Sequence, residues 1–242
     1  MKKIVIFMLV LSCILSNATA SEKAVKTGDM QILDNSKTAI LVVEFQKTWT
    51  ERSFFHWLIE KEYESKNVLQ NTQQLLEVAR KNGLIIIQSP FILDKNDKDK
   101  YSKIPFLPKL FGQFTANTWR AEYTDGIFDK SDIEVKGRTA FDNTVDSNLQ
   151  EILKENKIEK VYLVGFTTDH CVAETMDTLI SDGYECILVS DCTAARNRKI
   201  QKKIENKYTS VSSKKIIEEI SDQVYQGPRS HQSVGTVEYS PL

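Results

Sequence analysis

Residues 160–172 read KVYLVGFTTDHCV, an apolar strand followed at once by a turn and the start of a helix. The run from Val161 to Val164 predicts a buried strand, and Gly165 begins the turn. Cys171 then stands where the helix is expected to begin. Because the unpaired N–H groups and positive dipole end of a helix favour thiolate over thiol, this position indicates a nucleophilic cysteine. The simpler alternative is a small apolar cysteine that fills space beneath the helix.

Strand-like and helix-like segments alternate on both sides of this stretch. The predicted strands are 38–43, 84–88, 160–164 and 185–189, and the predicted helices are 67–82, 146–156, 171–182 and 197–206. Strands that alternate with helices are typical of a parallel sheet covered on both faces. The sequence therefore predicts an α/β fold.

The alternation stops between residues 91 and 136. This segment holds a charge-rich run, two prolines and the aromatic residues Phe106, Phe111, Phe114 and Trp119. A long excursion of this kind is usually a binding loop or a lid. The other interpretation, an ordered surface flap whose aromatic side chains bury themselves, is equally compatible with the pattern. A lid with these aromatics predicts a pocket for a small, partly flat molecule.

The first 20 residues resemble a secretory signal peptide. Lys2 and Lys3 precede the apolar run 4–15, and Ala18-Thr19-Ala20 provides a cleavage site of small residues. We expect cleavage near Ala20, export to the periplasm or the exterior, and no stable membrane anchor, since a bilayer span needs about 20 apolar residues. A lipid attached to Cys13 is the competing possibility. A single domain is expected at 21–225, followed by a surface tail at 226–242.

Charge and cysteine content narrow the class of protein. The net charge of the 242 residues is −1, with lysines and acids interspersed, so a nucleic-acid surface has little support and a small molecule is the expected partner. After removal of the signal peptide, three cysteines would remain, an odd number that cannot form a complete disulfide framework. Cys186 and Cys192 are expected to be structural.

Two charged side chains follow predicted strands, at the sheet edge where α/β proteins bind ligands. Glu44 follows the strand 38–43 and could act as a base, although an acid at this position is ordinarily solvated or paired with a cation. Lys136 follows the stretch Ile133-Glu134-Val135 and could hold Glu44 ionised or polarise a substrate. These residues gain significance only together with Cys171.

Four stretches, 38–46, 136–141, 165–175 and 183–195, together resemble the isochorismatase-like cysteine hydrolase superfamily. The resemblance implies a three-layer α/β/α sandwich around a mostly parallel sheet. It places the acid, lysine and cysteine triad of that superfamily on Glu44, Lys136 and Cys171. It also implies a cis peptide bond between Phe166 and Thr167. Most members have Asp at the first position, so Glu44 is a departure.

The resemblance also bears on the substrate pocket and on metals. We expect Phe45, Gln46, Trp119, Phe141 and His170 to line the pocket. Nicotinamidases of this superfamily bind a metal through an Asp and histidines that follow the strand matching 84–88, and this chain has no histidine there. We therefore expect a site without metal and without cofactor.

The expected activity is hydrolysis of a small amide, ureide or related C–N bond, or of an isochorismate-type vinyl ether. Glu44 would take the proton of Cys171, and the backbone N–H groups of Thr167 and Cys171 would stabilise the oxyanion. The alternatives are a secreted, non-catalytic protein of the same fold that binds a small molecule, and a redox-sensing thiol protein. Relatives are commonly dimers or tetramers, so a homo-oligomer is possible.

Overall fold

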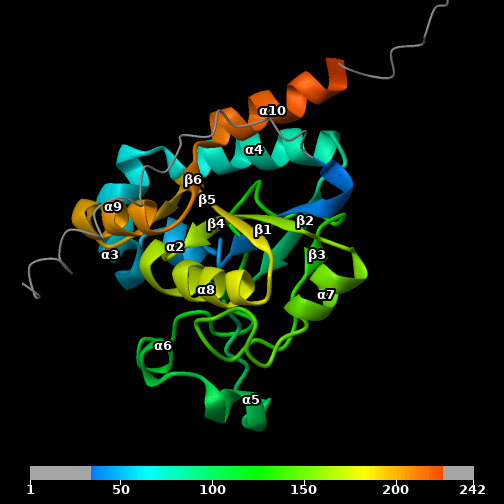
Figure 1. Cartoon of the computed structure of the whole chain (residues 1–242). Coiled ribbons are helices and arrows are strands. Elements are labelled where there is room, and N and C mark those ends of the chain that lie inside the picture. The colour runs from blue at the N-terminus through cyan, green and yellow to red at the C-terminus, as the bar shows by residue number, and fades with distance from the viewer. Residues whose placement is uncertain (1–33, 226–242) are drawn as a thin grey trace, which may run out of the picture. The chain divides into compact units, whose positions relative to one another are not determined.

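The computed structural model describes residues 34–225 (Figure 1). The signal peptide expected at 1–20 and the tail expected at 226–242 lie outside the described residues. Within them, six parallel strands form one sheet in the order β3-β2-β1-β4-β5-β6. The strands are β1 Thr38–Val43, β2 Ile85–Ser89, β3 Ile133–Glu134, β4 Lys160–Phe166, β5 Glu185–Ala194 and β6 Ser210–Val211.

Helices cover both faces of this sheet. The helices are α2 Lys47–Thr50, α3 Phe54–Ser65, α4 Val68–Lys81, α5 Lys98–Lys103, α6 Phe106–Leu110, α7 Leu149–Glu155, α8 Ala173–Ser181, α9 Arg198–Lys207 and α10 Ser213–Tyr225, with short 3-10 turns η1 Asn35–Lys37 and η2 Trp119–Ala121. Alternate residues of β1 point to opposite faces, as strand geometry requires. Ile40 and Val42 pack with α3, α4 and α10, whereas Ala39, Leu41 and Val43 pack with α7, α8 and α9. The predicted three-layer α/β/α sandwich is therefore confirmed (Figure 1).

The predicted elements agree with the structure except at their ends. The strand at 38–43 and the helix at 67–82 are found nearly as predicted. The strand expected to end at 189 continues to Ala194, because a register shift beyond Leu163 lets Thr193 and Ala194 pair with Gly165 and Phe166. The helix expected at 171–182 begins earlier, with a π-helical turn at Thr168–Val172. The alternation did not predict α10, whose Ile216 and Ile220 are buried against α4.

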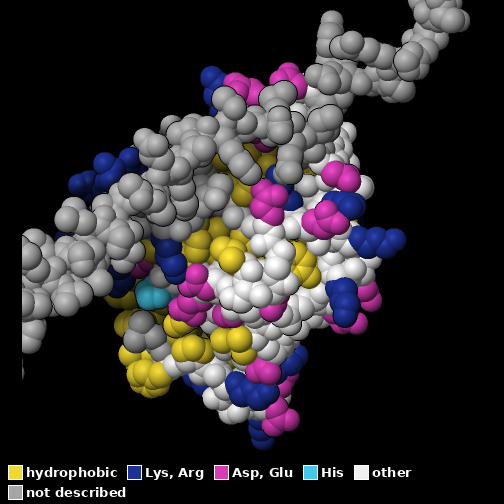
Figure 2. Space-filling model, in the orientation of Figure 1, with side chains coloured by type: hydrophobic (Ala, Val, Ile, Leu, Met, Phe, Trp, Pro, Cys, Tyr) yellow, Lys and Arg dark blue, Asp and Glu magenta, His cyan; other side chains and the backbone are white. Residues whose placement is uncertain are grey.

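The excursion between 91 and 136 carries α5, α6 and η2 and extends beyond the sheet (Figure 1). Each of the two interpretations describes part of it. Phe91 and Phe114 are buried in the core, as expected for a flap that packs on itself. Phe106, by contrast, is 70% exposed, and Leu110 and Phe111 are exposed beside it. Figure 2 shows hydrophobic side chains gathered over this part of the surface.

No helix within residues 34–225 is both long enough and apolar enough to cross a membrane.

Candidate active site

The register of the two central strands brings their carboxyl ends together. Val43 of β1 pairs with Gly165 of β4, so Glu44 and Phe166 follow at the same sheet edge. Gly165 has φ +107°, and a β-carbon there would lie 2.8 Å from the carbonyl carbon of Val43 and closer still to its oxygen. Real β-carbons essentially never approach within 3.0 Å. Glycine is therefore the residue that permits β1 and β4 to lie this close where the site begins.

The turn after β4 positions the cysteine. The peptide bond between Phe166 and Thr167 is cis, as expected. The chain then enters the π-helical turn Thr168–Val172, which continues directly into α8. This turn holds Cys171 with only 4% of its surface exposed.

Glu44 lies beside this thiol. Its side chain is buried, with 2% exposed, and its backbone has φ +50°, a conformation uncommon for a residue with a β-carbon. One carboxylate oxygen accepts a hydrogen bond from the guanidinium of Arg138, and the other accepts one from the indole Nε1 of Trp49 at 3.1 Å. The carboxylate lines the same cavity as Cys171, and its charge raises the pKa of that thiol. The structure thus brings Glu44 and Cys171 to one cavity.

The cation beside Glu44 is Arg138, which the sequence interpretation missed. Arg138 is buried, and its guanidinium also donates to the carbonyl oxygens of Ala140 at 3.0 Å, Phe141 at 2.9 Å and Ser89 at 3.3 Å. Its planar head lies 4.9 Å from the ring centre of Phe91. Only a forked guanidinium can satisfy several such acceptors at once, and a lysine at this position could not replace all of these bonds.

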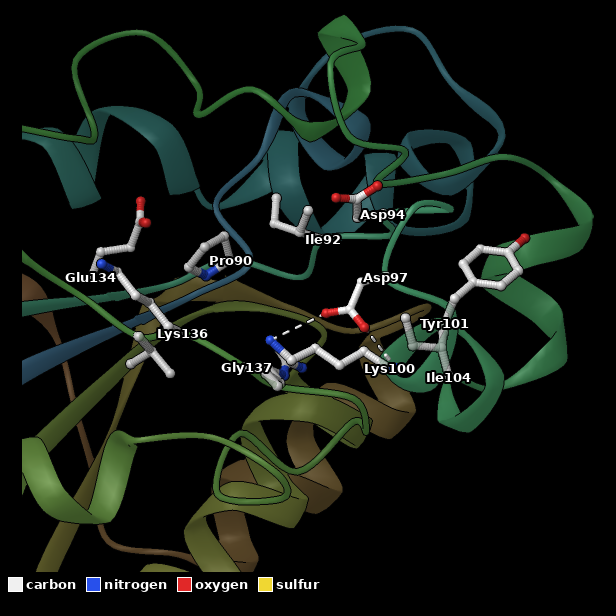
Figure 3. Close-up of a pocket in the computed structure, with 12 residues that line it drawn as sticks. Pro90, Ile92, Asp94, Asp97, Lys100, Tyr101, Ile104, Glu134, Lys136 and Gly137 are labelled. Carbon is white, nitrogen blue, oxygen red and sulfur yellow. Dashed lines mark hydrogen bonds and ion pairs between the residues drawn. The ribbon is translucent and has the colours of Figure 1, made fainter.

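The structure does not bring Lys136 to Glu44 and Cys171, so the sequence-based placement of the triad lysine is corrected. Val135 points into the core, and alternation along the chain turns Lys136 outward to solvent. Lys136 lines a separate hollow of about 240 Å³, together with Glu134 and Asp97, and Figure 3 shows its side chain there. Gly137, at φ +98°, turns the chain so that Arg138 points inward instead. The sequence does contain this second cation, Arg138, two residues beyond Lys136.

Burial is the main influence on the pKa of the Cys171 thiol. Removal from water raises the pKa of the Cys171 thiol well above its usual value, and the adjacent charge and hydrogen bond of Glu44 raise it further. Arg138 and the N–H of Thr167 act in the opposite direction but do not reverse the shift. The expectation of a resting thiolate was therefore wrong. It considered the dipole of the helix start and omitted the cost of a buried anion beside a carboxylate.

A cavity of about 420 Å³ opens onto these groups. Its lining is mainly aromatic and aliphatic, and it consists of Glu44, Trp49, Phe55, Leu58, Phe91, Pro105, Pro108, Phe114, Phe141, Thr167, His170, Cys171 and Arg196. Two of the five predicted pocket residues, Phe141 and His170, belong to it. The apolar part comes largely from α3 and from the excursion, which contributes Phe91, Pro105, Pro108 and Phe114.

The other three predicted pocket residues do not line the cavity. Phe45 packs in the core with its ring 4.7 Å from that of Phe166. Gln46 is fully buried, and its amide bonds the backbone of Phe91 and Ala121, which fastens the excursion to the end of β1. Trp119 is partly exposed and stacks with Arg120. None of the three faces the cavity.

The remaining groups with reactive potential do not form a second centre in residues 34–225. No group of three or more His, Cys, Asp or Glu side chains could hold a metal ion in this part of the chain. Cys186 and Cys192 are free and buried on β5, as expected for structural cysteines. Burial raises the pKa of Cys186 to about 12, and that of Cys192 also rises, so neither thiol is activated.

One known protein family matches most of the described residues. The model of the isochorismatase domain matches residues 38–210, from the first residue of β1 to the first of β6. The chain belongs to the isochorismatase family. Its fold is that of an isochorismatase-like hydrolase, and the superfamily resemblance is confirmed.

Individual relatives are distant. A probable inactive nicotinamidase of Arabidopsis thaliana is 23% identical over 167 residues, which cover 67% of this chain and 83% of the relative. An uncharacterised isochorismatase family protein of Bacillus subtilis is 28% identical over 159 residues, 66% of this chain and 74% of the relative. Among solved structures, a cysteine hydrolase from Pseudomonas syringae pv. phaseolicola has a TM-score of 0.68 at 17% identity, covering 79% of this chain and 95% of its own.

A second solved structure, an N-carbamoylsarcosine amidase from Thermoplasma acidophilum, has a TM-score of 0.59 at 21% identity and covers 73% of this chain and 96% of its own. At these identities, the structural likeness shows the fold alone. The chemistry of this chain has to be argued from its own residues.

Proposed function

We propose that this chain is a cysteine-dependent hydrolase of a small molecule, with Cys171 as nucleophile and Glu44 as proton acceptor. The observation that carries the proposal is that Cys171 and the buried Glu44 carboxylate line one largely apolar cavity, where the charge of Glu44 raises the pKa of the thiol. A nucleophile beside a base is the arrangement required for covalent catalysis.

The reaction on an amide or ureide proceeds in two halves. Glu44 takes the thiol proton while the sulfur attacks the carbonyl carbon, and the electron pair of the C=O bond moves to oxygen. When this intermediate collapses, the C–N bond breaks and Glu44 returns the proton to the leaving nitrogen. Water then loses a proton to Glu44 as it attacks the thioester, and the departing sulfur regains that proton. The net change is the addition of one water across the C–N bond. An isochorismate-type vinyl ether would be cleaved by the same acid and base without requiring the thioester.

The charge state of the site supports proton transfer at the moment of attack. Because the pKa of Cys171 is raised, the resting sulfur keeps its proton, and a base has to remove it when substrate binds. In the proposed mechanism, the backbone N–H groups of Thr167 and Cys171 stabilise the negative charge that develops on the substrate oxygen. Arg138 acts as a positioning residue, since a guanidinium keeps its proton and serves to orient Glu44 and to offset its charge.

A hydrolysis screen tests this proposal. The mature protein would be assayed on small amides, ureides, esters and isochorismate, with Cys171→Ala as the inactive variant and Cys186→Ala as the matched control. Cys186 is also a buried free cysteine, but it lies on β5 outside the cavity. We expect turnover to be lost in the first variant and kept in the second. Full activity of Cys171→Ala would exclude the cysteine mechanism.

A second candidate is a protein that binds a small molecule in the same cavity without turning it over. Two observations favour it: both oxygens of Glu44 are already engaged, by Arg138 and Trp49, and the cation is not the lysine that the superfamily resemblance implies. The relative from Arabidopsis thaliana is itself described as probably inactive. Saturable binding that is unchanged by Cys171→Ala, with no hydrolysis across the screen, would identify this function.

A further inference from the structure

Gln201 of α9 is a buried polar side chain that takes no part in the proposed reaction. It is fully buried, and so is Thr168, the first residue of the π-helical turn that carries Cys171. Glutamine is mostly exposed in proteins, and buried amide groups are hydrogen-bonded. The hydrogen bonds of Gln201 therefore show what this side chain holds together.

The side-chain oxygen of Gln201 joins two walls of the cavity. Oε1 accepts a hydrogen bond from the hydroxyl of Thr168 at 3.0 Å and another from the backbone N–H of Ala195 at 2.8 Å. Thr168 begins the turn that carries Cys171, and Ala195 directly follows the end of β5. Cys171 and Arg196, the residue after Ala195, both line the cavity. One amide oxygen thus ties the turn of the nucleophile to the segment beyond β5.

The amide nitrogen fixes the orientation of this contact. Nε2 of Gln201 donates to Oε1 of Glu205 at 2.9 Å, and the same oxygen accepts from Nζ of Lys66 at 2.9 Å. Burial alone would raise the pKa of Glu205, but the hydrogen bonds from Lys66 and Gln201 lower it below its usual value. Glu205 is therefore a carboxylate, which can only accept. Because the nitrogen of Gln201 has to face this carboxylate, its oxygen has to face Thr168 and Ala195.

The far end of this chain of hydrogen bonds is attached to the sheet. Lys66 lies between α3 and α4, and its Nζ also donates to the carbonyl oxygen of Ser190 in β5 at 2.8 Å. The side chain of Lys66 is 10% exposed and that of Glu205 is 19% exposed. Hydrogen bonds shielded from water are electrostatically stronger than exposed ones. The chain from Ser190 through Lys66, Glu205 and Gln201 therefore connects the rigid sheet to the turn.

We propose that Gln201 is a positioning residue, which holds the Cys171 turn in its catalytic arrangement through the hydroxyl of Thr168. A nucleophile has to be kept within a fraction of an ångström of its productive position, and the hydrogen bonds behind it provide that restraint. The contribution of Gln201 to turnover rests on the proposed function. The restraint on the turn is a property of the folded protein and can be measured without a substrate.

Alkylation of the native protein by iodoacetamide tests this restraint. The labelling rates of Cys171, Cys186 and Cys192 are followed at one pH by mass spectrometry, and all three cysteines are buried. We expect Gln201→Met, which keeps a side chain of similar size without the hydrogen bonds, to label Cys171 about tenfold faster than the parent. Labelling of Cys186 and Cys192 should stay unchanged, because general unfolding would expose all three thiols.

Two substitutions at Thr168 separate its hydroxyl from its shape. Thr168→Val keeps the shape and loses the hydroxyl, so it should accelerate labelling of Cys171 as Gln201→Met does. Thr168→Ser keeps the hydroxyl and should label close to the parent rate. Because the two residues act through one hydrogen bond, the double variant Gln201→Met/Thr168→Val should label no faster than Gln201→Met alone.

Gln88→Met is the matched control. Gln88 is also a fully buried glutamine, but its amide donates to the carbonyl oxygen of Ile127 and to Asp132, away from the turn. We expect Gln88→Met to label Cys171 at the parent rate. Three results would each overturn the inference: an unchanged Cys171 rate in Gln201→Met, equal acceleration of all three cysteines, or effects at the two positions that multiply in the double variant.

The hydrolysis assay separates this inference from the proposed function. With a substrate from the screen, Gln201→Met should lower kcat about tenfold and change KM by less than twofold. If Cys171→Ala keeps full activity while the labelling pattern is as expected, the restraint by Gln201 stands and the cysteine mechanism falls. If turnover requires Cys171 but Gln201→Met leaves both kcat and labelling unchanged, the mechanism stands and the positioning role falls.

Discussion

Replacing Gly165 with alanine should separate the two strands that hold Glu44 and Cys171. The new β-carbon would lie 2.8 Å from the carbonyl carbon of Val43 and 2.9 Å from its nitrogen, inside the 3.0 Å limit of real contacts. Overpacking of this kind typically costs about 1–3 kcal/mol. The positive φ of +107° adds about 1–2 kcal/mol for a residue with a β-carbon. We therefore expect Gly165→Ala to lose about 2–5 kcal/mol of unfolding free energy.

Gly183→Ala is the matched control for this prediction. Gly183 also has a positive φ, +95°, but a β-carbon there would meet nothing within 4 Å. Both substitutions restrict the unfolded chain equally, so that effect cancels in the comparison. Urea unfolding should then give a difference of about 1–3 kcal/mol between the variants, which is the steric cost at Val43 alone. Equal stabilities would show that β1 and β4 can move apart without cost, and would refute the argument that Gly165 sets the geometry of the site.

Three further predictions concern the charged groups. Glu44→Gln should lower the pH midpoint of iodoacetamide labelling of Cys171, measured by mass spectrometry, because it removes a negative charge beside the thiol. Arg138→Met should raise that midpoint, because it removes a positive charge. Shifts in the same direction for both variants would contradict this prediction. Arg138→Met should also lower the free energy of unfolding by about 3–5 kcal/mol, because Glu44 is left buried without its partner. Lys136 is exposed, so Lys136→Ala should change the free energy of unfolding by less than about 0.5 kcal/mol. Similar thermal unfolding of the two variants would show that the ion pair is unimportant for stability. Trp49→Phe keeps an aromatic ring but loses the 3.1 Å hydrogen bond to Glu44. Turnover should therefore fall about tenfold or more with little change in KM, as expected for a lost hydrogen bond to a charged group. A change confined to KM would assign Trp49 to substrate binding instead.

The fold was predictable because its main signals are local and repeated. The β-branched run at 38–43 and the amphipathic helix at 67–82 carry their periodicity in the sequence itself. The prolongation of β5 to Ala194 was not predictable in this way, since it depends on a register shift in its pairing with β4. The π-helical turn before α8 likewise leaves no periodic signal, because one extra residue per turn changes neither the composition nor the caps.

The site was predictable where strand order alone decides position. Glu44 and Cys171 come together because each follows one of two adjacent parallel strands. The cation was not predictable from the same argument, since β3 has only two residues and the chain beyond it turns at Gly137. Whether Lys136 or Arg138 points inward depends on that turn, which the closeness of a β-carbon to Asp146 and Ser147 restricts to glycine. Two residues with the same charge therefore differ in role through one backbone angle.

The order of strands also places charged side chains on both sides of the Cys171 thiol. Along the sheet edge, Arg138 follows β3, Glu44 follows β1, Cys171 follows β4 and Arg196 follows β5. At rest, Arg138 pairs with Glu44 and Arg196 pairs with Asp169, and burial raises the pKa of the sulfur between them. In the proposed mechanism, Glu44 accepts the thiol proton as the sulfur bonds to the carbonyl carbon, and the negative charge passes from the carboxylate to the carbonyl oxygen.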